Sequence, residues 1–328
     1  MKTDNAGAKP ALRGLRVGQY GSLFLSIAVL FLALMGYQIL ASKGAAKGSA
    51  LTDAGNLALV LESKLETEFD AADRAVSAMV REIDADAMHQ DAVGRWELQI
   101  ARWLQSRVTG VPSVSALRYF DAGGNRLYSS VEGEAAFNIA DRPFFQKLRN
   151  EPTTATVFSD VAVGRSSGRV AMWAAKAILG ADLRFLGVAV AAIDVSVLHK
   201  QFGQINLGKD GVVALRRIEN GALVVRFPGP VAVDNQPAPE LPVRHAIMKQ
   251  GPNGTIDITS PVDGIQRIYG YRRIGSFPFF VAVAIADNDF LAEWRRNSLQ
   301  LALAAVAFLA ILAGVFARLS IAESRRNS

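Results

Sequence analysis

The chain has 328 residues, half of them hydrophobic, and it contains no cysteine. This length is enough for more than one folded unit, and the absence of cysteine excludes a disulfide framework. The net charge of +6 is small, and basic and acidic residues are interleaved along the chain. The sequence therefore shows no basic footprint for nucleic-acid binding.

Two stretches without charged residues lie near the ends of the chain, at residues 17–42 and 297–317. Each is long enough to cross the roughly 30 Å hydrocarbon core of a membrane as a helix. The first stretch could instead be a cleaved signal peptide, but its apolar part is longer than the about 7–15 residues usual in such peptides. We therefore predict two transmembrane helices, at residues 18–42 and 297–317.

Basic residues flank both predicted spans and suggest their orientation. Four precede the first span and three arginines follow the second, which assigns residues 1–17 and 318–328 to the cytoplasm. Four further basic residues on the opposite side weaken this signal, but long translocated regions are little affected by such charges. The sequence thus predicts a two-pass membrane protein with residues 43–296 outside the cytoplasm, which in a Gram-negative cell means the inner membrane and the periplasm.

The region after the first span begins with a helical stalk, predicted over residues 50–110. Apolar residues recur every three or four positions across residues 57–83, and a second helical pattern covers residues 91–107. Thr52 or Asp53 is a candidate N-cap for the first of these helices. Its apolar stripe suits a core face or a dimer seam, and a helix leaving a membrane span can also carry a displacement along its axis.

Two successive sets of predicted strands follow the stalk. The first set, residues 112–203, begins with a hairpin at residues 113–131 and ends with a buried strand and a helix after Asp194. The second set, residues 204–287, begins with a hairpin around the turn ENG and ends in a strand before the second span. The predicted fold class is α+β, with a long N-terminal helix and two antiparallel-sheet modules flanked by two transmembrane helices.

The sequence contains no arrangement typical of an enzyme or a metal site. Its three histidines are isolated, and no HExxH, P-loop, G-x-S-x-G or dinucleotide-binding fingerprint occurs. No pair of carboxylates is singled out as an acid and a base. We therefore predict no catalytic residues, no metal and no cofactor.

A candidate ligand site is the stretch FNIADRPFFQKL, which places an arginine beside aromatic residues. Arg142 could bind a ligand carboxylate through two parallel hydrogen bonds. Phe137, Phe144 and Phe145 could form the apolar or cation-binding walls of a pocket. Asp194, at the end of the buried run VAVAAID, could accept a hydrogen bond from a ligand amine.

Each of these residues also has a purely structural interpretation. Asp141 could cap a short helix, and Arg142 could form a salt bridge with a neighbour. Asp194 could cap the helix that follows it, a use compatible with ligand binding. Trp173 is a candidate for a pocket wall, but a tryptophan in such a strand is more often a core residue. Arg169, beside a turn, suits a solvated position.

The order of these elements resembles the double Cache (dCache) sensor domains of bacterial receptors, in which two PAS-like modules stack on one long helix. The resemblance covers nearly the whole outer region, and it is similar in particular to the sensors in front of diguanylate cyclases and sensor histidine kinases. It is carried by phrases such as ALRYFDAGGNRLYSS, DRPFFQKL, FLGVAVAAIDVSVLHKQF and GSFPFFVAVAIADNDFLAEWRR. It implies a homodimer, with the ligand in the membrane-distal module, residues 112–203, and residues 204–287 as the membrane-proximal module.

The amino-acid-binding members of this family carry a tyrosine, an arginine five positions later, a tryptophan and tyrosine after it, and a later aspartate. The matching positions here are Phe137, Arg142, Phe144, Phe145 and Asp194. The charged pair is kept, but the hydroxyl and indole donors are missing. The resemblance therefore implies a small ligand that is a carboxylate, an amine or amino-acid-like.

Receptors of this kind continue past the second span into kinase, cyclase or methyl-accepting regions, and residues 318–328 contain no such domain. The resemblance implies either a sensor that signals through a separate cytoplasmic partner or the input half of a longer receptor. A third reading is a structural or interaction protein that kept the fold without a ligand. A first module whose interior is filled by Phe137, Phe144 and Trp173 would favour this third reading.

Overall fold

The computed structural model of the protein describes residues 11–108 and 112–327. Residues 1–10, part of the predicted cytoplasmic segment, and residues 109–110 of the predicted stalk lie outside the described residues. The chain divides into two compact units, one made of residues 1–50 and 288–328 and the other of residues 51–287. We describe each unit by itself.

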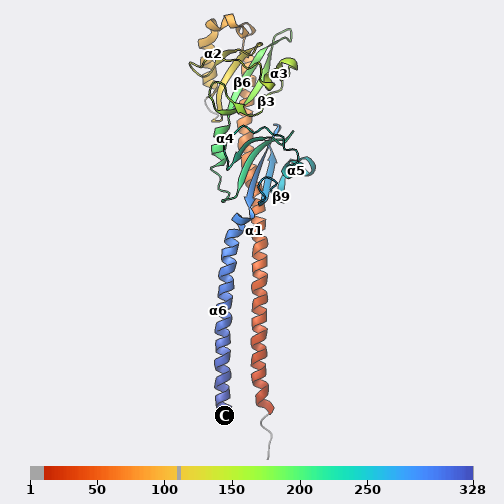
Figure 1. The fold of residues 1–328 in the computed structure, drawn as a ribbon, viewed down its shortest axis with the longest axis vertical. Coiled ribbons are helices and arrows are strands. Elements are labelled where there is room, and N and C mark those ends of the chain that lie inside the picture. Colours follow the sequence, from red (N-terminus) through yellow and green to blue (C-terminus); the bar gives the residue numbers. More distant parts are fainter. Residues whose placement is uncertain (1–10, 109–111, 328) are drawn as a thin grey trace, which may run out of the picture. The chain divides into compact units, whose positions relative to one another are not determined.

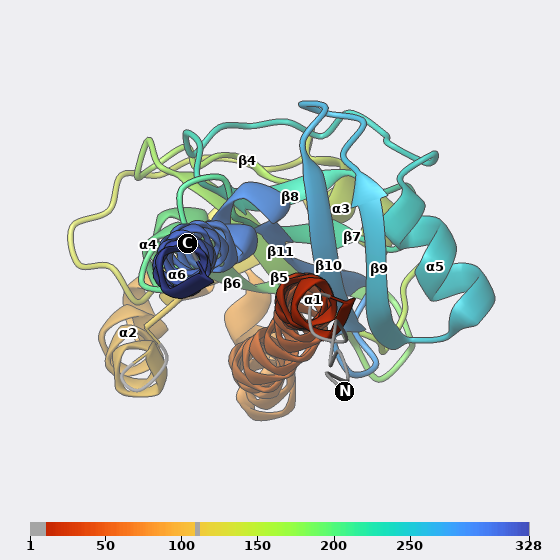
Figure 2. The ribbon, with the colours of Figure 1, turned by 90° about the horizontal axis from the view of Figure 1, so that it is seen from below.

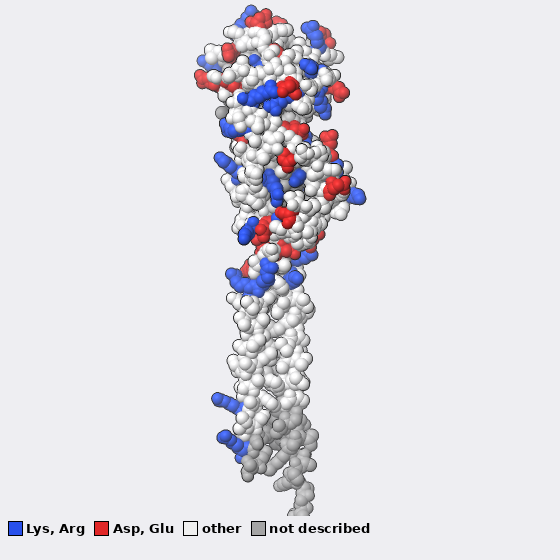
Figure 3. Space-filling view, viewed as in Figure 1, with Lys and Arg blue, Asp and Glu red and all other residues white. Residues whose placement is uncertain are grey.

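The first unit consists of two long helices, the N-terminal part of α1 (Ala11–Glu82) and nearly all of α6 (Asp287–Asn327). Both are long and apolar enough to cross a membrane, with 18-residue windows of mean hydropathy 2.2 and 2.5. The two helices contact each other through Phe24 with Phe316 and Phe31 with Phe308, whose ring centroids lie 5.3 and 4.7 Å apart. Figure 3 shows an uncharged surface along the described middle of this pair.

Helix α1 is continuous across the predicted boundary between the first span and the stalk (Figure 1). The prediction that Thr52 or Asp53 caps a new helix is therefore wrong, because both residues lie inside α1. The physical reason is the absence of proline between residues 11 and 82, since isolated glycines lower helix stability without ending the helix.

The second unit contains two antiparallel sheets. The first sheet has the strand order β2-β1-β6-β5-β3, with β4 also paired to β5. Its strands are β1 (Val114–Asp121), β2 (Arg126–Ser129), β3 (Val157–Phe158), β4 (Ala162–Val163), β5 (Val170–Leu179) and β6 (Phe185–Asp194). The run of small and branched residues in β6 lies in the middle of this sheet, as predicted for a buried strand. We call this sheet and its helices the first module; α2 (Val93–Val108) and α3 (Pro143–Asn150) belong to it.

The second sheet has the order β8-β7-β11-β10-β9. Its strands are β7 (Val212–Arg217), β8 (Leu223–Phe227), β9 (Asn253–Thr259), β10 (Gln266–Arg273) and β11 (Phe279–Ala286). Helix α4 (Val195–Phe202) connects the two sheets, and α5 (Pro242–Gln250) lies against β9 and β10 (Figure 2). We call this sheet with α5 the second module. The α+β fold class, with two PAS-like sheets and a long N-terminal helix, is confirmed.

The apolar stripe of α1 forms part of the core of the second unit. Leu61, Leu65, Phe69, Val76 and Met79 are buried in one cluster that also contains residues of both sheets. The structure therefore supports the interpretation of this stripe as a core face.

Polar contacts also attach each sheet to α1. In the first module, the Lys176 amine donates to the Ser77 hydroxyl at 2.9 Å. In the second module, Arg272 forms an ion pair with Glu62 at 2.8 Å. Because both pairs are half-buried and lie on different turns of α1, a shift of either sheet along this helix would break a directional contact.

At Gly270, the backbone of β10 lies close to the backbone of α1. A Cβ atom at this position would lie 2.1 Å from the carbonyl oxygen of Ala54 and 2.3 Å from its carbonyl carbon. We expect Gly270→Ala to lower the free energy of unfolding by about 1–3 kcal/mol, because backbone atoms would have to move apart. Urea unfolding followed by tryptophan fluorescence measures this change. The control is Gly94→Ala in α2, where nothing lies within 4 Å of the added atom, and an equal loss in both variants would contradict the prediction.

Candidate ligand-binding site

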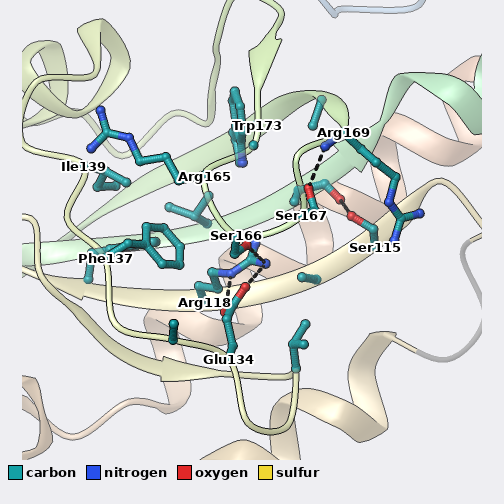
Figure 4. Close-up of a pocket in the computed structure, with 18 of the residues that line it drawn as sticks. Ser115, Arg118, Glu134, Phe137, Ile139, Arg165, Ser166, Ser167, Arg169 and Trp173 are labelled. Carbon is teal, nitrogen blue, oxygen red and sulfur yellow. Dashed lines mark hydrogen bonds and ion pairs between the residues drawn. The ribbon is translucent and has the colours of Figure 1, made fainter.

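A cavity of about 490 Å³ opens on one face of the first sheet (Figure 4). Its floor is formed by β1, β5 and β6, and its walls by the segment after β2, the start of α3 and residues 164–169 between β4 and β5. This volume lies within the range of roughly 300–1,000 Å³ typical of small-molecule sites. The cavity is not filled by Phe137, Phe144 and Trp173, which line it instead.

Arg142 directly precedes the first turn of α3, and it lines this cavity. Its guanidinium lies 5.2 Å from the ring of Trp173 and donates to the carbonyl oxygen of Val163 at 2.8 Å. The ring of Phe144 also stacks with that of Trp173, and their centroids lie 6.1 Å apart. Among the described residues, no carboxylate lies within ion-pair distance of Arg142. The cavity thus contains the guanidinium cation of Arg142, which lies against the ring of Trp173. Its positive charge is not neutralised by a carboxylate in direct contact among the described residues.

Burial lowers the pKa of Arg142, the nearby Arg165 lowers it further, and Asp141 acts in the opposite direction. An arginine remains protonated at neutral pH in spite of such effects. The two effects that lower the pKa both disfavour the charged form, so an anion that reaches Arg142 relieves an existing electrostatic cost.

Arg118 and Glu134 form a closed ion pair in the same cavity. The Arg118 guanidinium donates two hydrogen bonds to the Glu134 carboxylate, at 2.8 and 2.6 Å, and the Ser129 hydroxyl adds a third at 2.6 Å. Burial alone would raise the pKa of Glu134, but the hydrogen bonds from Arg118, Ser129 and Ser166 outweigh it and lower this pKa to about 2. Glu134 therefore stays ionised at neutral pH, and Arg118 is already neutralised.

The two remaining arginines of the cavity are also paired. Arg165 bonds to the exposed carboxylate of Asp141 and lowers its pKa. Arg169 lies 3.0 Å from the Asp194 carboxylate, whose other oxygen accepts from the backbone of Ser196 and caps α4. Arg169 is exposed, as predicted, but it is ion-paired. Asp194 thus fulfils its structural interpretation as a helix cap.

The structure brings together four of the six residues predicted to bind the ligand: Phe137, Arg142, Phe144 and Trp173 all line the cavity. Phe145 does not line the cavity, because its ring is fully buried and packs against Phe185. The reason is helix geometry, since consecutive residues of α3 point in directions about 100° apart.

Two predictions from the sequence are corrected by the structure, one at the start of α3 and one at the start of α4. Asp141 does not cap α3, because the N-cap residue is Arg142 and it makes no side-chain capping bond. Pro143 occupies the first helical turn as expected. Asp194 does not line the cavity, because its carboxylate is 5% exposed and engaged by Arg169 and the α4 backbone.

The sequence reasoning missed four charged residues that line the cavity, Arg118, Glu132, Glu134 and Arg165. Arg118 had a signal, because it is a charged residue that interrupts the run of apolar residues in β1. Glu134 and Arg165 lie in connecting segments, where no periodicity indicates the direction of a side chain.

Comparison with known proteins shows which proteins have a similar fold. Residues 196–284 match the family model dCache_1_like, described as a histidine kinase sensor domain. The extracellular domain of the histidine kinase rpHK1S-Z16 aligns over 74% of this chain and 96% of its own, with 22% identity and a TM-score of 0.62. The outer region has the double Cache fold. The resemblance inferred from the sequence is therefore confirmed.

Two chemoreceptor domains share this double Cache fold. The ligand-binding domain of Campylobacter jejuni Tlp3, solved with L-valine, is 12% identical, covers 76% of this chain and 97% of its own, and has a TM-score of 0.52. That of Pseudomonas fluorescens CtaA, solved with L-isoleucine, is 14% identical, with coverage of 77% and 98% and a TM-score of 0.51. A sequence search among curated proteins finds no match.

Proposed function

We propose that this protein is a membrane-anchored sensor whose first double Cache module binds a small organic carboxylate in the periplasm. The observation that carries the proposal is Arg142, a guanidinium without a carboxylate partner among the described residues, held against Trp173 in an open cavity. Arginine binds carboxylates through two parallel hydrogen bonds, and the surrounding aromatic rings suit an apolar ligand body.

The pairing of Asp194 favours a ligand without an amine. An amine needs a carboxylate or other acceptors in the cavity, but Asp194 is held by Arg169, Glu134 is held by Arg118, and Asp141 is held by Arg165. Glu132, which also lines the cavity, is exposed. The similar domains of Tlp3 and CtaA were solved with amino acids, so the ligand that we propose for this chain, a carboxylate without an amine, belongs to a different chemical class.

The two apolar helices support a role in signalling across the inner membrane. In this proposal, α1 and α6 cross the membrane, the chain acts as a homodimer, and a cytoplasmic partner or a further region of the receptor reads the signal. The ligand shifts the equilibrium only through a difference in its affinity for two arrangements of the first module. The chain itself then needs no catalytic residue, which agrees with a fold shared with sensor domains.

A thermal-shift screen on the full chain in nanodiscs tests this function. The panel contains short mono- and dicarboxylates, amino acids and amines at equal ionic strength. A ligand at 100 times its Kd is expected to add about 2.7 kcal/mol of stability. Stabilisation that requires an amine would contradict the carboxylate proposal, and a folded protein with no hit would favour the ligand-free structural reading.

Arg142→Ala is expected to weaken binding of such a hit tenfold to about a hundredfold, because a charge-assisted hydrogen bond contributes about 1.5–3 kcal/mol. The Kd is measured by titration calorimetry on the same nanodiscs. Arg149→Ala is the matched control, since Arg149 lies on the same helix α3 but is exposed and does not line the cavity. Equal affinities of the two variants would show that the ligand binds elsewhere.

A further inference from the structure

The two modules repeat a short sequence at the same place in their sheets. Residues 116–118 of β1 and residues 214–216 of β7 both read Ala-Leu-Arg. The strand orders β2-β1-β6-β5-β3 and β8-β7-β11-β10-β9 are equivalent, so β1 and β7 each lie between an outer hairpin partner and the central strand. Arg216 therefore occupies in the second module the position that Arg118 occupies at the cavity of the first.

The second module also has a cavity on the corresponding face. Its volume is about 60 Å³, and it lies between β7, β8, β11 and the start of α5. Both α3 and α5 begin with a proline in the first turn, and both contribute their first residues to the cavity of their module. The residues that line this cavity include Ala214, Arg216, Arg226, Val243, Ile258 and Phe280.

The two arginines of this cavity differ in their partners. Arg226 lies 3.4 Å from Asp263, which also receives a hydrogen bond from the buried Arg267 at 2.6 Å. Arg216 is half-buried and donates to the carbonyl oxygen of Gly221 at 2.8 Å, and among the described residues no carboxylate lies within 4.0 Å of it. Within the described part of the chain, Arg216 therefore has no counterpart of Glu134, the partner of Arg118.

The guanidinium of Arg216 has no negatively charged group in direct contact among the described residues. Burial lowers the pKa of Arg216, Arg226 lowers it further, and the more distant Asp234 and the Tyr269 hydroxyl act in the opposite direction. Asp234 is exposed and beyond ion-pair distance. An anion in the cavity would replace the missing partner at short range.

We propose that the second module carries a separate site for a small aliphatic monocarboxylate, with Arg216 binding its carboxylate. The volume is about twice the roughly 30 Å³ share of one water molecule, which suits an anion of about three or four non-hydrogen atoms. Val243, Ile258 and Phe280 provide an apolar wall for a methyl group. The apolar wall suits a carboxylate that carries a methyl group better than a phosphate or sulfate, which presents polar oxygens on all sides.

Acetate is the probe that tests this site. The thermal stability of the full chain in nanodiscs is titrated with sodium acetate against sodium chloride at the same ionic strength. We compare the wild type with Arg216→Met, which removes the charge and keeps the apolar stem, and with Ala214→Val, which fills the cavity and keeps the arginine. Arg142→Ala reports on acetate that binds in the first module.

The expected result is a saturable acetate effect that persists in Arg142→Ala and weakens about tenfold or more in Arg216→Met and Ala214→Val. An effect that is lost in Arg142→Ala and kept in Arg216→Met would overturn the proposal, as would a response no larger than that to chloride. If Arg216→Met does not fold, the acetate titration of Ala214→Val tests the site: weaker acetate binding supports the proposal, and unchanged binding contradicts it. The site is independent of the ligand of the first module, so failure of either proposal leaves the other testable.

Discussion

Glu134→Gln is expected to lower the free energy of unfolding of the double Cache domain by about 3–5 kcal/mol, because it removes one member of a buried ion pair. The Glu134 side chain is 4% exposed and that of Arg118 is 8% exposed, so the arginine would be left as an unpaired charge away from water. Urea unfolding of the full chain in nanodiscs, followed by tryptophan fluorescence, measures the change.

The control for this prediction is Glu132→Gln, two residues earlier on the exposed side of the same segment, which should change stability by no more than about 0.5 kcal/mol. If the cost comes from the stranded arginine, the double variant with Arg118→Met will lose less than the sum of the two single losses. Equal effects of Glu134→Gln and Glu132→Gln would show that the pair contributes nothing to stability.

The lowered pKa of Glu134 predicts that the free energy of unfolding depends on pH. The pKa of Glu134 falls from an ordinary 4.5 to about 2 in the folded protein, so its contribution is fully present above 4.5 and is lost as the pH falls towards 2. Stability measured across this window should therefore decline less steeply in Glu134→Gln than in the wild type. Parallel declines would mean that other carboxylates cause the acid sensitivity.

Phe69→Ala is expected to cost about 3–5 kcal/mol, because this fully buried ring of α1 holds the two sheets together. Its ring centroid lies 5.7 Å from Phe158 of the first module and 5.6 and 5.1 Å from Phe277 and Phe279 at the start of β11. Phe158 also contacts Phe277 and Phe279 directly. Removing Phe69 leaves a cavity where α1 and both modules meet.

Calorimetry of the full chain in nanodiscs distinguishes this role from a simple loss of core. We expect the unfolding transition of Phe69→Ala to shift to lower temperature and to broaden or split, because the modules lose part of their shared core. Leu59→Ala on the same helix is the control, since Leu59 is 46% exposed. A variant that unfolds in one sharp transition at the wild-type temperature would rule out this role for Phe69.

Much of the fold was predictable because its signals are local. The charge-free runs, the stripe of α1, the hairpins and the buried run of β6 each depend on neighbours within a few residues, and all were found in the structure. The continuous helix was missed, because a candidate cap such as Asp53 has the same sequence signature whether the chain begins a helix there or passes through.

The sequence by itself determined the class of the protein and the place of Arg142, Phe137 and Phe144 in a pocket region. Only the tertiary structure decided which charges are available for a ligand. Arg142 and Arg118 are both arginines near aromatic residues, but the loop after β2 brings Glu134 to Arg118 and brings no carboxylate to Arg142 among the described residues. Ion pairing depends on distances of a few ångströms between segments far apart in the chain, and local sequence patterns do not encode these distances.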